Sequence, residues 1–195
     1  GNTVSGVTIT TAGLSKNIGG LVGCFKGGTL ANNKISDSTI NLNYTSTTEF
    51  ATCIGGAVGS VGFAEDKVAG AMSATNNTVS NVDINANCLI RGMGGFAGYV
   101  TGDAGSTFTG NKVTGADIAT TALRDSDNVS EINIHVGGFA GCVDTASSFS
   151  ECSVSTSNIT MRGRTYYYAG FVGSTYSDTI AATPANGAVT VEKCF

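Results

Sequence analysis

The sequence predicts an all-β protein: a right-handed parallel β-helix (β-solenoid) of about five irregular coils, forming one repeat domain over residues 1–195. Three observations predict this fold class. A short run containing paired glycines recurs five times, and a second segment rich in Asn and β-branched residues alternates with it. The composition, with 28 Gly, 26 Thr, 19 Ser, 16 Asn and a single Pro, favours strands and turns over helices.

The glycine-rich run occupies residues 18–23, 54–59, 93–98 and 136–141, and a fifth copy at 168–173 has lost its first glycine. Paired glycines break helices and weaken ordinary strands. In a stacked coil they permit a sharp corner and a close approach between layers. One coil cannot bury its apolar face alone, so we expect coils to stack at about 4.8 Å. The structural glycines of the five copies are Gly19, Gly20, Gly23, Gly55, Gly56, Gly59, Gly94, Gly95, Gly98, Gly137, Gly138, Gly141, Gly170 and Gly173.

The Asn-rich segment that alternates with the glycine run predicts a strand, and its apolar residues keep the same spacing in every copy. Residues 2–9 match residues 77–84 almost position by position. Residues 192–195 fit the same motif, with Phe195 in the position of Val154. Both termini fall inside a repeat, so we expect a segment of a longer array with flanking repeats. A β-sandwich is the main rival, but it leaves the fixed glycine spacing without a cause. The right hand follows from the general preference of parallel crossovers.

The run Gly20-Leu21-Val22-Gly23 resembles the GLUG-type repeats of bacterial secreted and surface proteins, which are named for a Gly-Leu-apolar-Gly motif. Phe or Ala replaces Leu in the other copies. The resemblance implies a secreted or cell-surface location in a bacterium. It also implies either an adhesin-like protein or an accessory region of a surface peptidase located elsewhere in the parent chain.

The charge pattern excludes several classes of partner. A net charge of −4 with ten basic residues argues against nucleic-acid binding and against a basic membrane patch. No apolar run reaches the roughly 18 residues of a membrane span, so no membrane insertion is expected from this segment. Residues 1–4 show no Met and no basic region, so we expect any signal peptide to lie outside it.

The single histidine, His135, is not expected to be catalytic. It falls at the outward phase of its strand, where the other copies carry Asn17, Cys53, Gly92 and Tyr167. One histidine also excludes a His-Glu-x-x-His zinc motif. We therefore expect no enzyme and no cofactor.

The six cysteines contain no C-x-x-C pair, which removes thioredoxin-like and zinc-ribbon interpretations. Cys24 and Cys142 share one position three coils apart, about 14 Å and beyond disulfide reach. We expect buried free thiols, and a bridge between Cys142 and Cys152 stays open. The six are Cys24, Cys53, Cys88, Cys142, Cys152 and Cys194.

Two groups of acidic residues are candidates for a functional site. Asp83 and Asp117 fall at one position of successive coils, about 5 Å apart on an outer face, where paired carboxylates could support glycoside chemistry. Thr8, Thr39 and Asn158 continue that row, so an ordinary polar surface is the alternative. Asp125, Asp127 and Glu131 alternate in one long loop and could bind a cation, although the turn glycine of an EF-hand is missing.

One dense aromatic group could bind sugar or protein. Tyr166, Tyr167 and Tyr168 are flanked by Arg162 and Arg164. Strand alternation sends Tyr167 to one side and its neighbours to the other, so one side is expected to face the core. The sequence thus predicts a non-enzymatic, adhesin-like repeat module, a rigid spacer or display scaffold contacting a host protein, a matrix or a glycan. The alternative is a carbohydrate-active β-helix that binds or cleaves polysaccharide.

Overall fold

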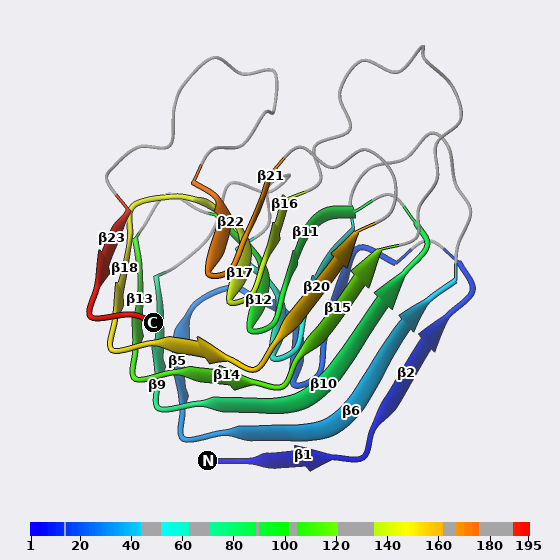
Figure 1. Ribbon diagram of the computed structural model, residues 1–195. Coiled ribbons are helices and arrows are strands. Elements are labelled where there is room, and N and C mark those ends of the chain that lie inside the picture. The colour runs from blue at the N-terminus through cyan, green and yellow to red at the C-terminus, as the bar shows by residue number, and fades with distance from the viewer. Residues whose placement is uncertain are drawn as a thin grey trace.

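The computed structural model describes residues 1–13, 15–43, 52–62, 71–88, 90–101, 105–120, 135–161, 167–175 and 189–195. Across these residues the chain is all-β, with strands arranged in four sheets and every strand pair parallel. The register is regular except between Ile90 and Gly92, where the pairing of β11 (Ile90–Gly94) with β7 (Thr52–Gly55) shifts. Successive coils wind around one axis as a right-handed parallel β-helix (Figure 1). The predicted fold class is confirmed, and the β-sandwich is wrong because its strand pairs would be antiparallel.

Sheet A forms two outer sides of every coil. Its long strands β6 and β10 bend midway, whereas the other coils use two short strands in the same place. Its strands are β1 (Thr3–Ser5), β2 (Thr8–Thr11), β6 (Lys34–Leu42), β10 (Thr78–Ala86), β14 (Lys112–Thr114), β15 (Asp117–Thr120), β19 (Ser153–Ser155) and β20 (Asn158–Met161).

Sheets B, C and D each contain five strands, one per coil. Sheet B consists of β3 (Asn17–Gly19), β7 (Thr52–Gly55), β11 (Ile90–Gly94), β16 (His135–Gly137) and β21 (Tyr167–Ala169). Sheet C consists of β4 (Val22–Phe25), β8 (Val58–Val61), β12 (Ala97–Thr101), β17 (Ala140–Asp144) and β22 (Val172–Ser174). Sheet D consists of β5 (Gly28–Ala31), β9 (Met72–Thr75), β13 (Ser106–Thr109), β18 (Ser147–Ser150) and β23 (Thr190–Glu192).

Sheets B and C form an arch that points into the interior of the coil, with the paired glycines at its tip (Figure 1). A Cβ built on Gly95 would lie 2.3 Å from the carbonyl oxygen of Gly138 and 2.7 Å from Val113 Cγ1 in sheet A. A Cβ on Gly98 would lie 2.4 Å from the amide nitrogen of Ile54. Only glycine therefore fits where the arch tip meets sheet A and where sheets B and C meet. The close approach predicted from the glycine runs is confirmed.

Aromatic rings fill the core beside the arch. Phe96 and Phe139, which follow the paired glycines, stack with ring centroids 4.9 Å apart. Phe108 and Phe149 from sheet D stack at 4.6 Å and meet Phe139 edge-on. All four side chains are fully buried. The in-register strands thus place identical residues on neighbouring coils in geometries that favour aromatic pairs.

A ladder of buried asparagines runs along the corner between sheets D and A. The Oδ1 atom of Asn77 accepts hydrogen bonds from the Asn33 backbone amide at 3.0 Å and from Asn33 Nδ2 at 2.7 Å. In the same way, Asn111 Oδ1 accepts from the Asn77 backbone amide at 3.0 Å and from Asn77 Nδ2 at 2.8 Å. Asn77 Nδ2 also donates to the carbonyl oxygen of Leu30 at 2.8 Å. These contacts satisfy polar groups that would be costly to bury unpaired.

Each coil turns two corners through residues with positive φ. One corner column is Gly6, Asp37, Asn81, Gly115 and Thr156, and the other is Asn32, Asn76, Gly110, Glu151 and Lys193. Gly, Asn and Asp adopt this left-handed conformation at little cost, whereas a β-branched residue is strained in it.

Thr156 has φ 49° and should be the weakest of these corners. Replacing Thr156 by Asn is expected to stabilise the fold by about 1 kcal/mol, because Asn tolerates the left-handed region better. Urea denaturation would measure the change. Thr160→Asn is the matched control, since Thr160 is also exposed but lies in the extended strand β20. Equal effects of the two substitutions would contradict the strain argument.

Candidate ligand-binding face

The outer face of sheet A carries rows of polar side chains, one from each coil. Along β10 the burial alternates, so that Asp83 and Asn85 are exposed while Ile84 and Ala86 are buried in the core. Because the strands stack in register, every outward position continues as a row along the solenoid. This face is therefore flat, polar and repetitive.

The predicted juxtaposition of Asp83 and Asp117 is confirmed. The two residues are direct partners on β10 and β15, and the row continues through Thr39 and Thr8 on one side and Asn158 on the other. The Asn158 side-chain amide donates to Asp117 Oδ1 at 2.8 Å. Both carboxylates lie on an exposed face. General acid catalysis needs a group held near its reacting partner, usually in a cleft that limits water.

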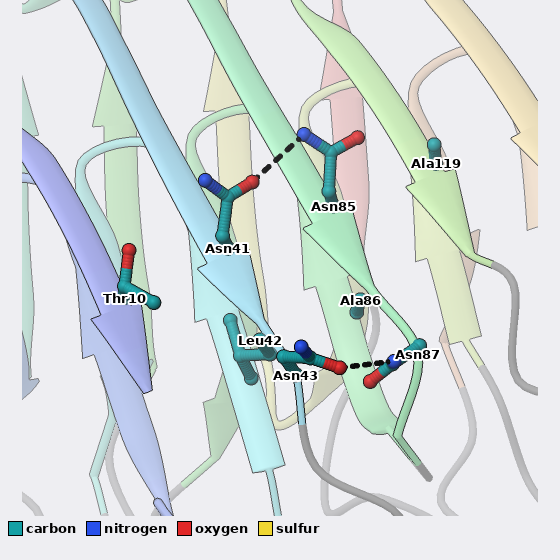
Figure 2. Close-up of a pocket in the computed structure, with 8 residues that line it drawn as sticks. All are labelled: Thr10, Asn41, Leu42, Asn43, Asn85, Ala86, Asn87 and Ala119. Atoms are coloured by element: carbon teal, nitrogen blue, oxygen red, sulfur yellow. Dashed lines mark hydrogen bonds between the residues drawn. The ribbon is translucent and has the colours of Figure 1, made fainter. Parts of the chain in front are cut away.

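The neighbouring rows line a shallow hollow of about 410 Å³, shown in Figure 2. Asn85 Nδ2 donates to Asn41 Oδ1 at 3.1 Å, and Asn87 Nδ2 donates to Asn43 Oδ1 at 2.6 Å (Figure 2). The lining is uncharged and consists of Thr10, Asn41, Leu42, Asn43, Asn85, Ala86, Asn87 and Ala119.

These amides can recognise a ligand with hydroxyl groups. In the Asn41–Asn85 pair, the shared hydrogen bond uses one nitrogen and one oxygen, which leaves the Asn41 amide nitrogen as a donor and the Asn85 oxygen as an acceptor toward solvent. A sugar hydroxyl both donates and accepts, so it can bond to either group. Sequence reasoning missed these asparagines, although their common phase beside Asp83 was a signal that could have found them.

Of the aromatic group, only Tyr167 and Tyr168 lie within the described residues, and Arg162, Arg164 and Tyr166 lie outside them. Tyr167 and Tyr168 are 37% and 68% exposed. Tyr168 pairs in register with the core residue Val136, so its side of the strand continues the core-facing row, but in this coil the side chain is exposed.

His135 lies where the repeat predicted, in register with Gly92 and Tyr167. Its side chain points away from the main core but is buried, not exposed, with its ring stacked on Tyr167 at 5.1 Å between centroids. His135 and Tyr167 are direct partners on β16 and β21 of sheet B, so their stacked rings lie side by side on that sheet and not on the polar face of sheet A. The two form no common site with Asp83 or Asp117.

The predicted cation loop, with Asp125, Asp127 and Glu131, lies outside the described residues. Among the residues that the structure does describe, no group of three or more His, Cys, Asp or Glu side chains could hold a metal ion.

The cysteines are all thiols, four of them buried and two partly exposed. Cys53 and Cys142 lie with Tyr99 in a small cluster between sheets B and C. Cys152 instead belongs to the main core, at the end of the asparagine ladder. The bridge between Cys142 and Cys152 that the sequence left open is therefore excluded by their separate positions.

Sequence reasoning also missed the polar residues around this cluster. The Arg91 guanidinium lies 4.6 Å from the centre of the Tyr99 ring. The Tyr99 hydroxyl donates to Asp144 Oδ2 at 3.1 Å and accepts from Arg91 Nη2 at 3.4 Å. The Tyr99 hydroxyl thus connects the positive charge of Arg91 with the negative charge of Asp144. These residues are far enough apart in the sequence that no motif predicted the contact.

Burial of the Cys53 and Cys142 thiols makes the stability of the fold depend on pH. Burial raises the pKa of the Cys53 thiol to about 12, and it also raises the pKa of Cys142. In the unfolded chain the pKa of a cysteine thiol is about 8.5. The stabilisation is thus complete below that value and is lost as pH rises toward the folded pKa, because the unfolded state then binds fewer protons.

We therefore expect the free energy of unfolding to fall above about pH 9, by up to about 1.4 kcal/mol per pH unit for each buried thiol. Urea denaturation between pH 7 and 10.5 would measure the decline. A Cys53→Ser variant should show a shallower decline than the wild type. An identical slope in the two proteins would contradict the assignment.

No helix long and apolar enough to cross a membrane is present among the described residues. Comparison of the chain with family models, with curated proteins and with solved structures gave no significant match.

Proposed function

We propose that the protein is a non-enzymatic, adhesin-like repeat module on the surface of a bacterium or secreted by one, acting as a rigid scaffold that displays a glycan-binding face. The observation that carries this proposal is the amide-lined hollow of about 410 Å³ on a flat, in-register sheet. The resemblance of the glycine runs to GLUG-type repeats supports the location.

The scaffold role rests on internal order. Strand pairs continue in register from coil to coil, and the buried asparagine ladder connects four successive coils. Ordered scaffolds hold binding groups without the entropic cost of arranging them on binding. Side chains on the outer rows of sheet A are therefore displayed at fixed spacing.

The chemistry of the face favours a neutral glycan. The hollow carries amide and hydroxyl groups but no charge. The adjacent row on the same face presents Asp83 and Asp117, which would repel carboxylated or sulfated chains. Neutral sugars offer hydroxyl groups to the amides without this penalty.

The test is a glycan array probed with the full chain and with the variant Asn85→Ala. Binding to neutral glycans is expected, with a loss of about three- to tenfold in affinity for the variant, the equivalent of one or two hydrogen bonds. Thr107→Ala, on the exposed face of sheet D, is the matched control and should bind as the wild type does. A blank array, or equal loss in both variants, would refute the glycan-binding face.

The second candidate is polysaccharide cleavage, which the in-register pair Asp83 and Asp117 favours. If these carboxylates are catalytic, Asp83→Asn and Asp117→Asn should each abolish depolymerisation while binding persists. Product analysis by chromatography over a broad panel of polysaccharides distinguishes the two functions. Cleavage by the wild type that either variant loses would overturn the non-enzymatic proposal.

A further inference from the structure

The asparagine ladder ends in two cysteines that occupy its next two positions. In the ladder, the residue after each asparagine donates its amide to the carbonyl of the ladder residue one coil earlier, as Lys112 does to Asn77 at 2.9 Å. Ser153, which follows Cys152, donates to Asn111 in the same way at 2.9 Å. Phe195 donates in the same way to Cys152 at 3.2 Å. Cys194 therefore takes the ladder position directly next to Cys152, and Phe195 is the partner of Ser153. The sequence alignment of Phe195 with Val154 was wrong by one residue.

Hydrogen bonds on both sides fix this register. Before the cysteines, Ser150 and Glu192 are paired in β18 and β23, and Glu151 donates to the Glu192 carbonyl at 3.1 Å. After them, Val154 donates to the Phe195 carbonyl at 2.7 Å. Neighbouring strands lie about 4.8 Å apart, and disulfides join residues with Cα atoms about 4.4–6.8 Å apart. The spacing between Cys152 and Cys194 suits a disulfide.

Both thiols make only weak contacts that a disulfide could replace. The buried Cys152 thiol donates to the Phe108 carbonyl at 3.4 Å and lies 3.8 Å from Asn111 Nδ2. Cys194 is partly exposed, and its thiol donates to the carbonyl of Glu192 at 3.4 Å. Burial raises the pKa of the Cys152 thiol, and the neighbouring Cys194 raises it further by a smaller amount.

Cys24, Cys53 and Cys142 do not pair in register with a cysteine on a neighbouring strand. Cys53 and Cys142 share one cluster, but they lie on β7 and β17, two coils apart. Cys24 and Cys142 lie on one row, with Ser60 and Tyr99 between them. At about 4.8 Å per coil, these pairs are too distant for a disulfide.

We propose that Cys152 and Cys194 form a disulfide that covalently joins two neighbouring coils at the end of the asparagine ladder. The oxidant is a low-molecular-weight disulfide. The more exposed Cys194 attacks it as the thiolate, which forms a mixed disulfide and releases one small thiol. Cys152 then attacks the Cys194 sulfur as its thiolate and releases the second small thiol. The two cysteines lose two protons and two electrons, and the oxidant is reduced to two thiols.

The experiment treats the full chain with glutathione disulfide, blocks the remaining thiols in denaturant and counts them by mass. Four free thiols are expected in place of six, with Cys152 and Cys194 in one linked peptide after pepsin digestion at low pH, where disulfides do not exchange. The variant Cys194→Ser should form no linked peptide, while Cys24→Ser should still form it.

Three results would overturn the proposal. The oxidised chain could keep six thiols, it could link other cysteines, or it could carry glutathione on Cys194 without joining Cys152. Cys152→Ser removes a buried thiol and could impair folding, so the conclusion rests on Cys194→Ser, whose position is partly exposed. Circular dichroism of that variant before oxidation confirms that the comparison is made between folded proteins.

Discussion

Replacing Gly95 by alanine is expected to destabilise the fold by at least about 3 kcal/mol. The new Cβ would lie 2.3 Å from the carbonyl oxygen of Gly138 and 2.7 Å from Val113 Cγ1. The carbonyl belongs to the next coil and cannot move without breaking the strand pairing around it. Overpacking typically costs about 1–3 kcal/mol and costs more when the backbone must shift, a large part of the about 5–15 kcal/mol that stabilises a domain.

Gly170 supplies the matched control, because it holds the same position of the glycine run in the last copy. A Cβ on Gly170 would meet no atom within 4 Å. Gly170→Ala should therefore change the unfolding free energy by no more than about 0.5 kcal/mol. Urea denaturation measures both variants. Failure of Gly95→Ala to fold while Gly170→Ala folds fits the expectation, whereas equal stability of the two would contradict the steric account.

Replacing Asn77 by alanine is expected to cost about 3–4 kcal/mol. The Asn77 side chain accepts from the backbone and side chain of Asn33 and donates to Leu30 and Asn111. Its removal leaves buried donors and acceptors without partners, at about 1–3 kcal/mol each when no water enters. The cost should appear as a lower midpoint of urea denaturation.

Asn85→Ala is the control, since Asn85 also belongs to an amide pair but is exposed to water. Its cost should stay below about 0.5 kcal/mol. Asn77→Asp gives a second check, because its second oxygen would face the carbonyl of Leu30 and the Oδ1 of Asn111. Burial would raise the pKa of that carboxyl, so the variant should weaken further relative to wild type as pH rises from 4 to 7. Equal costs for Asn77→Ala and Asn85→Ala would contradict the ladder's role.

The repeat allowed the coil order to be predicted, because the glycine run and the Asn-rich strand mark fixed positions in every coil. The row of Asp83 and Asp117 followed from the same alignment. The inward arch could not be predicted in this way, because the glycine run indicates that backbones approach closely but does not indicate which sheets meet. His135 was therefore expected to be exposed, although the space between sheets B and C buries it.

Register near the C-terminus was predicted wrongly by one residue, because Phe195 was aligned with Val154, whereas aligning Cys194 with Cys152 gives the pairing that the structure shows. That shift concealed the adjacent cysteines. The amide hollow was missed for another reason: Asn41 and Asn43 are ordinary surface residues until Asn85 and Asn87 lie beside them. Binding surfaces of this kind arise between coils, and no single repeat contains them.

In-register stacking also determines how the fold comes apart. Each coil makes its hydrogen bonds and ring contacts with the coils on either side, as Asn77 does with Asn33 and Asn111. Stability is then a sum of nearest-neighbour couplings. Opening an interior coil breaks two interfaces, whereas opening an outer coil breaks one. When residues 1–195 are studied on their own, unfolding should therefore proceed as fraying from their outermost coils inward, with backbone amides of β7 to β17 exchanging last with solvent deuterium.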